Sequence, residues 1–232
     1  MRLNNYISST GICSRREADK LIQQRKVLIN GKVAEIGQVV NPNDVVKVNG
    51  KRVVPKKNDV YIALNKPVGI TCTTERHIKG NIIDYINYPE RIFPVGRLDK
   101  PSEGLIILTN DGTIVNKILR TENNHEKEYV VTVNKNITQD FINGMSNGVR
   151  IFNPVTNKYV VTNKCSITKV NNRTFKIVLT QGYNRQIRRM CENFNYEVQK
   201  LQRVRIMNLT IKGLPTGKWR KLKPFEVEAL LK

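Results

Sequence analysis

The chain has 232 residues, 39% of them hydrophobic, which is enough for one large domain, or for a medium domain and a small one, around a packed core. Forty Lys and Arg side chains against nineteen Asp and Glu give a net charge of +21, and a surface this basic attracts polyanions and releases counterions when it binds them. The charge therefore favours a nucleic acid as the partner. No apolar run is long enough to span a bilayer, so we expect no membrane partner.

Cysteine and histidine usage argues against metals and disulfides. The four cysteines contain no C-x-x-C pair, the two histidines lie far apart, and no glycine-rich fingerprint for a dinucleotide or phosphate is present, so we expect no metal and no cofactor. The N-terminus has no apolar signal-peptide core, and scattered free thiols are typical of a reducing compartment, so we expect a cytoplasmic protein.

The first fifty residues predict a small module of two helices followed by two strand–turn units. Residues 2–9 place apolar side chains at helical spacing, and Ser14-Arg15-Arg16-Glu17 is a capping box that begins a second helix. Strand residues 27–29 run into Asn30-Gly31, a strong hairpin signal, and 45–48 run into Asn49-Gly50. We place the module at residues 1–58, ending in a polar linker over 51–59.

Basic side chains gather in this module, with twelve Lys and Arg against five Asp and Glu in residues 1–60. Such a cluster at a helix start fits a surface that binds RNA, and an ordinary solvated helix face is the alternative. The residues we assign to RNA contact here are Arg2, Arg15, Arg16, Lys20, Arg25 and Lys26.

Residues 59–232 read as a second, strand-rich α+β domain. Strands in meander order with single helices between them favour a mostly antiparallel sheet. The expected strands are 60–64, 105–109, 128–134, 159–163, 173–180, 196–202 and 205–211, and the expected helices are 81–86, 112–120, 138–146, 185–194 and 223–231.

The segment from Gly96 to Asn110 is the most informative part of the chain. It places Asp99 in a turn-rich stretch two residues after Arg97, and an apolar run typical of a buried strand follows at once. A carboxylate at the mouth of a buried sheet in so basic a protein suggests chemistry on something negatively charged. The alternative is an aspartate that caps a turn and pairs with Arg97.

The expected helix over 185–194 carries a cluster of arginines. Its apolar residues form one stripe, and Arg185, Arg188 and Arg189 lie off that stripe near the helix start, where anions bind readily. Contacts to backbone phosphate are the alternative for all three. On the strand over 128–134, Tyr129 shares a face with alternate valines and is either core or functional.

These segments together resemble the pseudouridine synthases that modify ribosomal RNA. Gly96-Arg97-Leu98-Asp99 is similar to the catalytic motif of that family, Lys66-Pro67-Val68-Gly69 to the first motif, Lys127-Glu128-Tyr129 to the tyrosine-bearing strand and Gln186-Ile187-Arg188 to the third motif. Residues 2–50 resemble the RNA-binding module named after the fourth small-subunit ribosomal protein. Residues 184–192 and 205–208 most resemble the F subtype of the large-subunit enzymes.

The resemblance implies a small RNA-binding module and a catalytic domain built on a long, mixed, mostly antiparallel sheet with a central cleft. It implies Asp99 as nucleophile or general base, Arg188 as its charge partner and Tyr129 as a contact of the flipped uracil. The role of Arg97 stays open between holding a phosphate, orienting Asp99 and replacing the flipped base. The implied substrate is a uridine in large-subunit ribosomal RNA, with a transfer RNA uridine as a second target, and we expect a monomer. The alternative is a non-catalytic RNA-binding protein of ribosome assembly.

Overall fold

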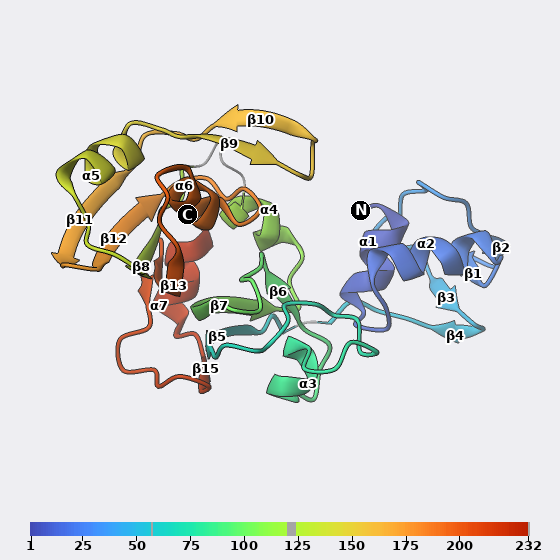
Figure 1. Cartoon of the computed structure of the whole chain (residues 1–232). Helices are drawn as coiled ribbons and strands as arrows, with labels where there is room; N and C mark the ends of the chain where they lie inside the picture. The colour runs from blue at the N-terminus through green and yellow to red at the C-terminus, as the bar shows by residue number, and fades with distance from the viewer. Residues whose placement is uncertain (57, 120–123, 232) are drawn as a thin grey trace. The chain divides into compact units, whose positions relative to one another are not determined.

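The computed structural model describes residues 1–56, 58–119 and 124–231 (Figure 1). Its chain divides into two compact units. The first comprises Met1–Val60 with Tyr88–Ile92 and Thr109–Gly112, and the second comprises Tyr61–Asn87, Phe93–Leu108 and Thr113–Lys232. The described residues include no helix long and apolar enough to cross a membrane. Our boundary between residues 58 and 59 stays a prediction.

The first unit is built from two helices and a small antiparallel sheet. Its core is formed by buried aliphatic side chains from both helices and all the longer strands. The capping box is confirmed: Ser14 accepts from the backbone of Glu17, and the Glu17 carboxylate accepts in return. The elements are α1 (Leu3–Ser9), α2 (Arg15–Gln23), β1 (Val27–Ile29), β2 (Lys32–Val33), β3 (Val46–Val48) and β4 (Lys51–Arg52), with strand order β2-β1-β3-β4.

The two hairpin turns of this unit form where the sequence indicated. Asn30 and Gly31 have φ of 51° and 81°, and Asn49 and Gly50 have 49° and 78°, the paired left-handed conformation that suits tight hairpins. The second turn also corrects our linker, which begins too early. The chain folds back into β4, which pairs with β3. Val53, which follows β4, is buried and packs into the small core of this unit.

The second unit contains, in its described residues, a nine-stranded sheet with main order β11-β12-β8-β13-β7-β5-β15, to which β14 and β6 are paired at the side. A separate hairpin is formed by β9 and β10. The strands are β5 (Tyr61–Lys66), β6 (Phe93–Val95), β7 (Glu103–Thr109), β8 (Lys127–Val133), β9 (Arg150–Asn153), β10 (Lys158–Val161), β11 (Ser166–Asn171), β12 (Thr174–Leu179), β13 (Val198–Ile206), β14 (Leu209–Thr210) and β15 (Trp219–Lys221).

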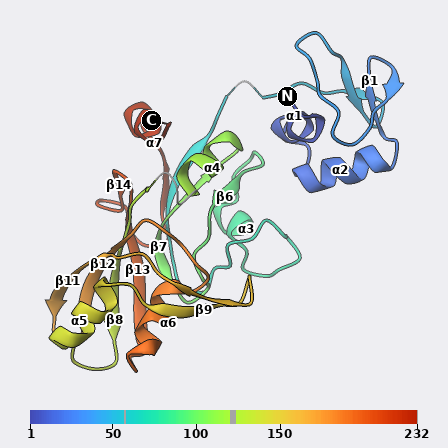
Figure 2. The ribbon, with the colours of Figure 1, turned by 90° about the horizontal axis from the view of Figure 1, so that it is seen from above.

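Helices cover both faces of this sheet. Ala63, Leu105 and Ile107 face a cluster formed with α4 and α7, whereas Phe141 of α5 packs edge-on against Phe175 of β12. Figures 1 and 2 show α5 beside β11 and β12 and α6 beside the β9–β10 hairpin. The helices are α3 (Ile82–Ile86), α4 (Thr113–Leu119), α5 (Gln139–Ser146), α6 (Gln186–Asn193) and α7 (Pro224–Leu231), and the five helices expected here are all present.

One pair of expected strands was divided wrongly. In place of strands over 196–202 and 205–211, a single long β13 runs through the gap, and the chain then turns into the short β14. The turn lies at Met207, whose φ of 51° ends the extended backbone, and Arg205 and Ile206 pair with β14 across it. The mixed, mostly antiparallel α+β fold is confirmed.

The sheet changes direction at one junction. β13 is antiparallel to β8 but parallel to β7, and the parallel register covers only Gln202↔Glu103 and Arg203↔Gly104. A Cβ on Gly104 would lie 2.6 Å from the backbone nitrogen of Arg203, and Gly104 has φ +109°. Only glycine therefore allows the two strands to approach here.

We expect Gly104→Ala to lower the free energy of unfolding by about 2–5 kcal/mol, because the left-handed backbone cost adds to overpacking against Arg203. Chemical denaturation monitored by circular dichroism measures the change. Gly112→Ala is the matched control, since nothing lies within 4 Å of a Cβ at that position. Equal stability of the two variants would contradict the steric account.

Candidate active site

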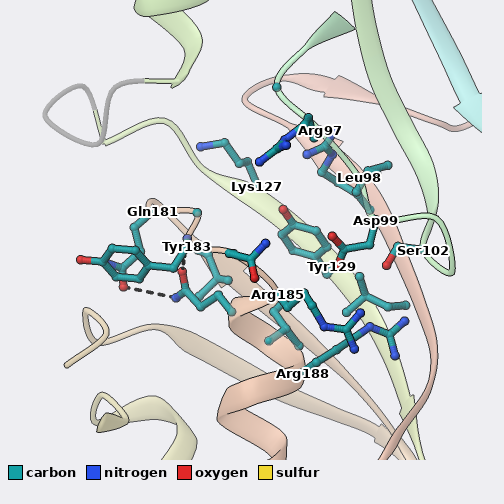
Figure 3. A pocket seen from close by; sticks show the side chains of 18 of the residues that line it. Arg97, Leu98, Asp99, Ser102, Lys127, Tyr129, Gln181, Tyr183, Arg185 and Arg188 are labelled. Atoms are coloured by element: carbon teal, nitrogen blue, oxygen red, sulfur yellow. Dashed lines mark hydrogen bonds between the residues drawn. The ribbon is translucent and has the colours of Figure 1, made fainter. Parts of the chain in front are cut away.

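A cavity of about 450 Å³ lies in the second unit at the junction of β7, β8 and β13 (Figure 3). Its volume is within the range of about 300–1,000 Å³ typical of small-ligand sites. Of its described lining residues, Asp99 is the single carboxylate. The basic lining residues are Arg97, Lys127, Arg185, Arg188 and Arg203.

The loop that carries Asp99 is held at three places. The Leu98 N–H donates to Sγ of Cys72 at 3.4 Å, and the Ser102 N–H donates to the Asp99 carbonyl at 3.0 Å. The Gly69 N–H donates to the Lys100 carbonyl at 2.8 Å. Leu98 is buried and Asp99 is half-buried, so the loop anchors its apolar residue and presents the carboxylate to the cavity.

The loop of residues 67–70 that supports the Asp99 loop is itself fixed by a fully buried lysine. Nζ of Lys66 donates to the carbonyls of Pro67 at 2.8 Å and Ile70 at 3.0 Å. Burial lowers the pKa of Lys66, and the nearby Cys72 and Asp99 oppose that shift. Lys66 thus links the end of β5 to the Asp99 loop through Gly69.

Tyr129 lies on β8 and faces the cavity. Its side chain is 9% exposed, and it pairs with Ile177 on one neighbouring strand and Arg203 on the other. In Figure 3 the Tyr129 ring lies beside Asp99, with Lys127 and Arg97 above it and Arg185 and Arg188 below. The ring is therefore placed as one wall of the cavity.

Arg188 projects from α6 toward the Asp99 loop. Nη1 donates to the Val198 carbonyl at 2.9 Å and Nη2 to the Pro101 carbonyl at 3.4 Å, while Nε is buried without a partner among the described residues. Burial and Arg185 lower the pKa of Arg188, and attraction to Asp99 opposes the shift. Among the described residues no ion pair within 4.0 Å joins Arg188 to Asp99, so their interaction here is electrostatic rather than a direct bond.

The remaining arginines near α6 divide into two groups. Arg97 and Arg185 line the cavity and are exposed, and Arg185 caps α6 with a left-handed backbone (φ 51°). Arg189 lies outside the lining and donates through Nε to the Asn184 carbonyl at 3.1 Å.

The six basic residues assigned to the first unit are all exposed, and three of them belong to α2.

Some lining residues were missed by the sequence reasoning. Ser102 is 1% exposed with its Oγ unpartnered among the described residues, and Arg203 is 5% exposed with Nη2 unpartnered. Lys127 also lines the cavity at 7% exposure. The sequence could have predicted this for Lys127, because it lies two residues before Tyr129 on the same strand. The position of Arg203 at the cavity depends on the pairing register of its strand, which the sequence did not specify.

Comparison with known proteins agrees along the whole chain. The family model of RNA pseudouridylate synthase matches residues 60–193, and the model of the S4 domain matches residues 1–46. The chain is 56% identical to the dual-specificity RNA pseudouridine synthase RluF of Escherichia coli K12, over 100% of this chain and 79% of that protein. It is 36% identical to the ribosomal large subunit pseudouridine synthase B of Bacillus subtilis 168, over 99% and 95%. A crystal structure of a pseudouridylate synthase superposes with a TM-score of 0.73 at 25% identity, covering 99% of each chain.

We expect Arg188→Ala to lower the free energy of unfolding by about 1–3 kcal/mol, because it leaves the carbonyls of Val198 and Pro101 without a donor. Arg185→Ala, which removes an exposed side chain from the same helix, should stay within about 0.5 kcal/mol. Urea denaturation compares the two. A larger loss for Arg185→Ala would mean that the two carbonyl bonds are not what holds α6 to the loop.

Proposed function

This chain belongs to the RNA pseudouridylate synthase family, and from that membership we propose that the cavity around Asp99 isomerises a uridine of large-subunit ribosomal RNA to pseudouridine. The observation that carries the proposal is the meeting of Asp99, Tyr129 and Arg188 in one cavity of a highly basic protein. These residues come from a loop, a strand and a helix far apart in the sequence.

Asp99 is the group that acts on the ribose. The reaction breaks the bond between C1′ and N1 of uracil, turns the base and rejoins it through C5. A carboxylate starts this either by attacking C1′ or by removing the proton from C2′, and we assign this step to the half-buried Asp99 that lines the cavity. Neither route requires an external cofactor.

Tyr129 and Arg188 position the reactants. A base that leaves its stack loses a few kcal/mol, and a ring beneath it restores part of that loss, so we assign Tyr129 to contact with the flipped uracil. Two backbone carbonyls hold Arg188 close enough to Asp99 for the two opposite charges to attract each other, so we assign Arg188 to positioning Asp99.

The first unit provides a separate contact to RNA. We assign Arg2, Arg15, Arg16, Lys20, Arg25 and Lys26 to phosphate binding, and Arg97, Arg185 and Arg189 to the RNA next to the target uridine. A tethered module raises the effective RNA concentration at the cavity. The name of the Escherichia coli relative, a dual-specificity enzyme, supports a transfer RNA uridine as a second target. We propose a monomer that acts in the cytoplasm.

We expect Asp99→Asn to lower the single-turnover rate by about 10³-fold or more while RNA affinity stays within a few-fold, since the reaction needs the carboxylate and binding needs the cations. Release of tritium from uracil-labelled ribosomal RNA and filter binding measure the two quantities. Asp140→Asn, on the exposed first turn of α5, is the control and should keep the wild-type rate. A wild-type rate in Asp99→Asn would favour the alternative of a non-catalytic assembly protein.

The salt dependence of RNA affinity measures how much α2 contributes to RNA binding. Replacing Arg15 and Arg16 by Gln should make the slope of log affinity against log salt shallower by about 0.9 for each duplex phosphate that the variant no longer neutralises. Replacing Lys32 and Lys47 by Gln removes the same charge from exposed positions on the strands of the same unit and serves as the control. Equal slopes for the two double variants would show that α2 is not the RNA-binding face.

A further inference from the structure

Two buried cations on the cavity wall have no part in the scheme above. Lys127 and Arg203 line the cavity at 7% and 5% exposure. Among the described residues, Nζ of Lys127 donates to the His125 carbonyl alone, at 3.1 Å, and Arg203 donates through Nε to the Leu105 carbonyl at 2.7 Å. No ion pair within the described ranges includes either residue, and Nη2 of Arg203 is buried without an acceptor there.

Both cations are neighbours of Tyr129 on the same face of the sheet. Side chains two residues apart on a strand share a face, which places Lys127 next to Tyr129 along β8. Arg203 is the cross-strand partner of Tyr129, and directly opposed residues have their Cβ atoms about 4.5–5.5 Å apart. A base stacked on Tyr129 would therefore have one cation toward each of two edges (Figure 3 shows Lys127 above the ring).

This arrangement costs stability in the absence of an anion. Burial lowers the pKa of Lys127, and the nearby Arg203 lowers it further. Two like charges in a poorly hydrated wall, with no carboxylate paired to them among the described residues, destabilise the fold. Buried cations in a cleft, of which Lys127 has a perturbed pKa, are typical of functional sites, where a bound anion offsets the penalty.

The flipped base fits this position better than a phosphate does. A phosphate of the RNA chain stays joined to its neighbours on the outside, where the exposed Arg97 and Arg185 meet it. Side chains that are only 5–7% exposed at the cavity wall are reached instead by the group that enters the cavity. That group becomes negatively charged during the reaction.

We propose that Lys127 and Arg203 are catalytic residues that bind the carbonyl oxygens of uracil and stabilise the negative charge that develops on the ring when its bond to ribose breaks. The inference rests on the proposed function and holds for either route. If Asp99 attacks, a C1′–ester bond replaces C1′–N1; if Asp99 takes the C2′ proton, the C2′–H electron pair forms a C1′=C2′ double bond. In both cases the C1′–N1 pair remains on the base, shared by N1, O2 and O4. When C5 bonds to C1′, the ester bond breaks and frees the Asp99 carboxylate on the first route, and Asp99 returns its proton to C2′ on the second. C5 then releases its proton and N1 gains one, so no atom is gained or lost.

The test uses the full chain with Lys127→Met, which keeps an unbranched side chain one atom shorter and removes its charge. We expect the single-turnover rate at saturating enzyme to fall by about 10²–10³-fold, as when one donor to a developing anion is removed. RNA affinity should stay within a few-fold, and the midpoint of thermal unfolding should be unchanged or higher, because a costly buried charge is gone. Lys127→Arg, which keeps the charge, should recover part of the rate.

Lys169→Met is the matched control. Lys169 also donates to a single backbone carbonyl, that of Ile137 at 2.9 Å, but it is exposed and lies outside the cavity lining. Its loss should leave the rate at the wild-type level.

A second substrate separates charge stabilisation from a structural role. RNA with 5-fluorouridine at the target carries a base whose anion is already stabilised by the electron-withdrawing fluorine. Loss of the target 5-fluorouridine, followed by nuclease digestion and chromatography, should therefore be slowed less by Lys127→Met than the reaction of uridine is. If Lys127 only held the His125 carbonyl, Lys127→Met would lower the reaction rates of uridine and 5-fluorouridine by the same factor.

The outcomes distinguish this inference from the proposed function. Four results for Lys127→Met would overturn the inference: a rate within threefold of wild type, an equal loss of rate on both substrates, a fall in rate together with a fall in the unfolding midpoint, or a loss of RNA affinity alone. In each case, formation of pseudouridine by the wild-type enzyme would still support the proposed function. If wild-type enzyme forms no pseudouridine, the proposed function fails and takes the inference with it.

Discussion

The close approach of β7 and β13 at Gly104 is the constraint on which the rest of the second unit depends. The backbone of Arg203 occupies the space of a side chain at Gly104, where the two strands share a parallel register of two residue pairs. On its other side β13 pairs with β8, which places Arg203 opposite Tyr129, while the Asp99 loop leads directly into β7. A wider spacing would separate the carboxylate from the wall that carries the base.

Charge in the cavity is arranged around a single carboxylate. Asp99 attracts both Arg188 and the buried Lys66, while Lys127 and Arg203 line the cavity without a carboxylate paired to either among the described residues. Buried cations of this kind lower the stability of the free protein, and an anionic substrate or intermediate offsets that loss. The protein therefore combines a stable scaffold with a locally unfavourable electrostatic site, as enzymes commonly do.

Local patterns predicted much of the fold, and their failures have physical reasons. The capping box at Ser14, the Asn-Gly turns and the apolar stripe of α6 depend on neighbouring residues, so the sequence alone locates them. The short strand β15 has no such local signal, because its partner β5 is distant in the chain, and β6 is only three residues long, one of them a proline. For the site, motif resemblance pointed to Asp99, Tyr129 and Arg188, and the structure brings all three to one cavity. Arg203 required the register of β13 with the distant strand β8, which no pattern around residue 203 specifies.

The same parallel junction sets an order of events when the protein folds. The hydrogen bond from Arg203 to Leu105 joins residues 98 positions apart, and contacts this distant in sequence form slowly because the intervening chain must first be ordered. The cavity around Asp99 is lined by β8, α6 and β13, all of which come later in the chain than the aspartate itself. A chain in which β13 has not docked would therefore carry the basic surface without a complete reactive site.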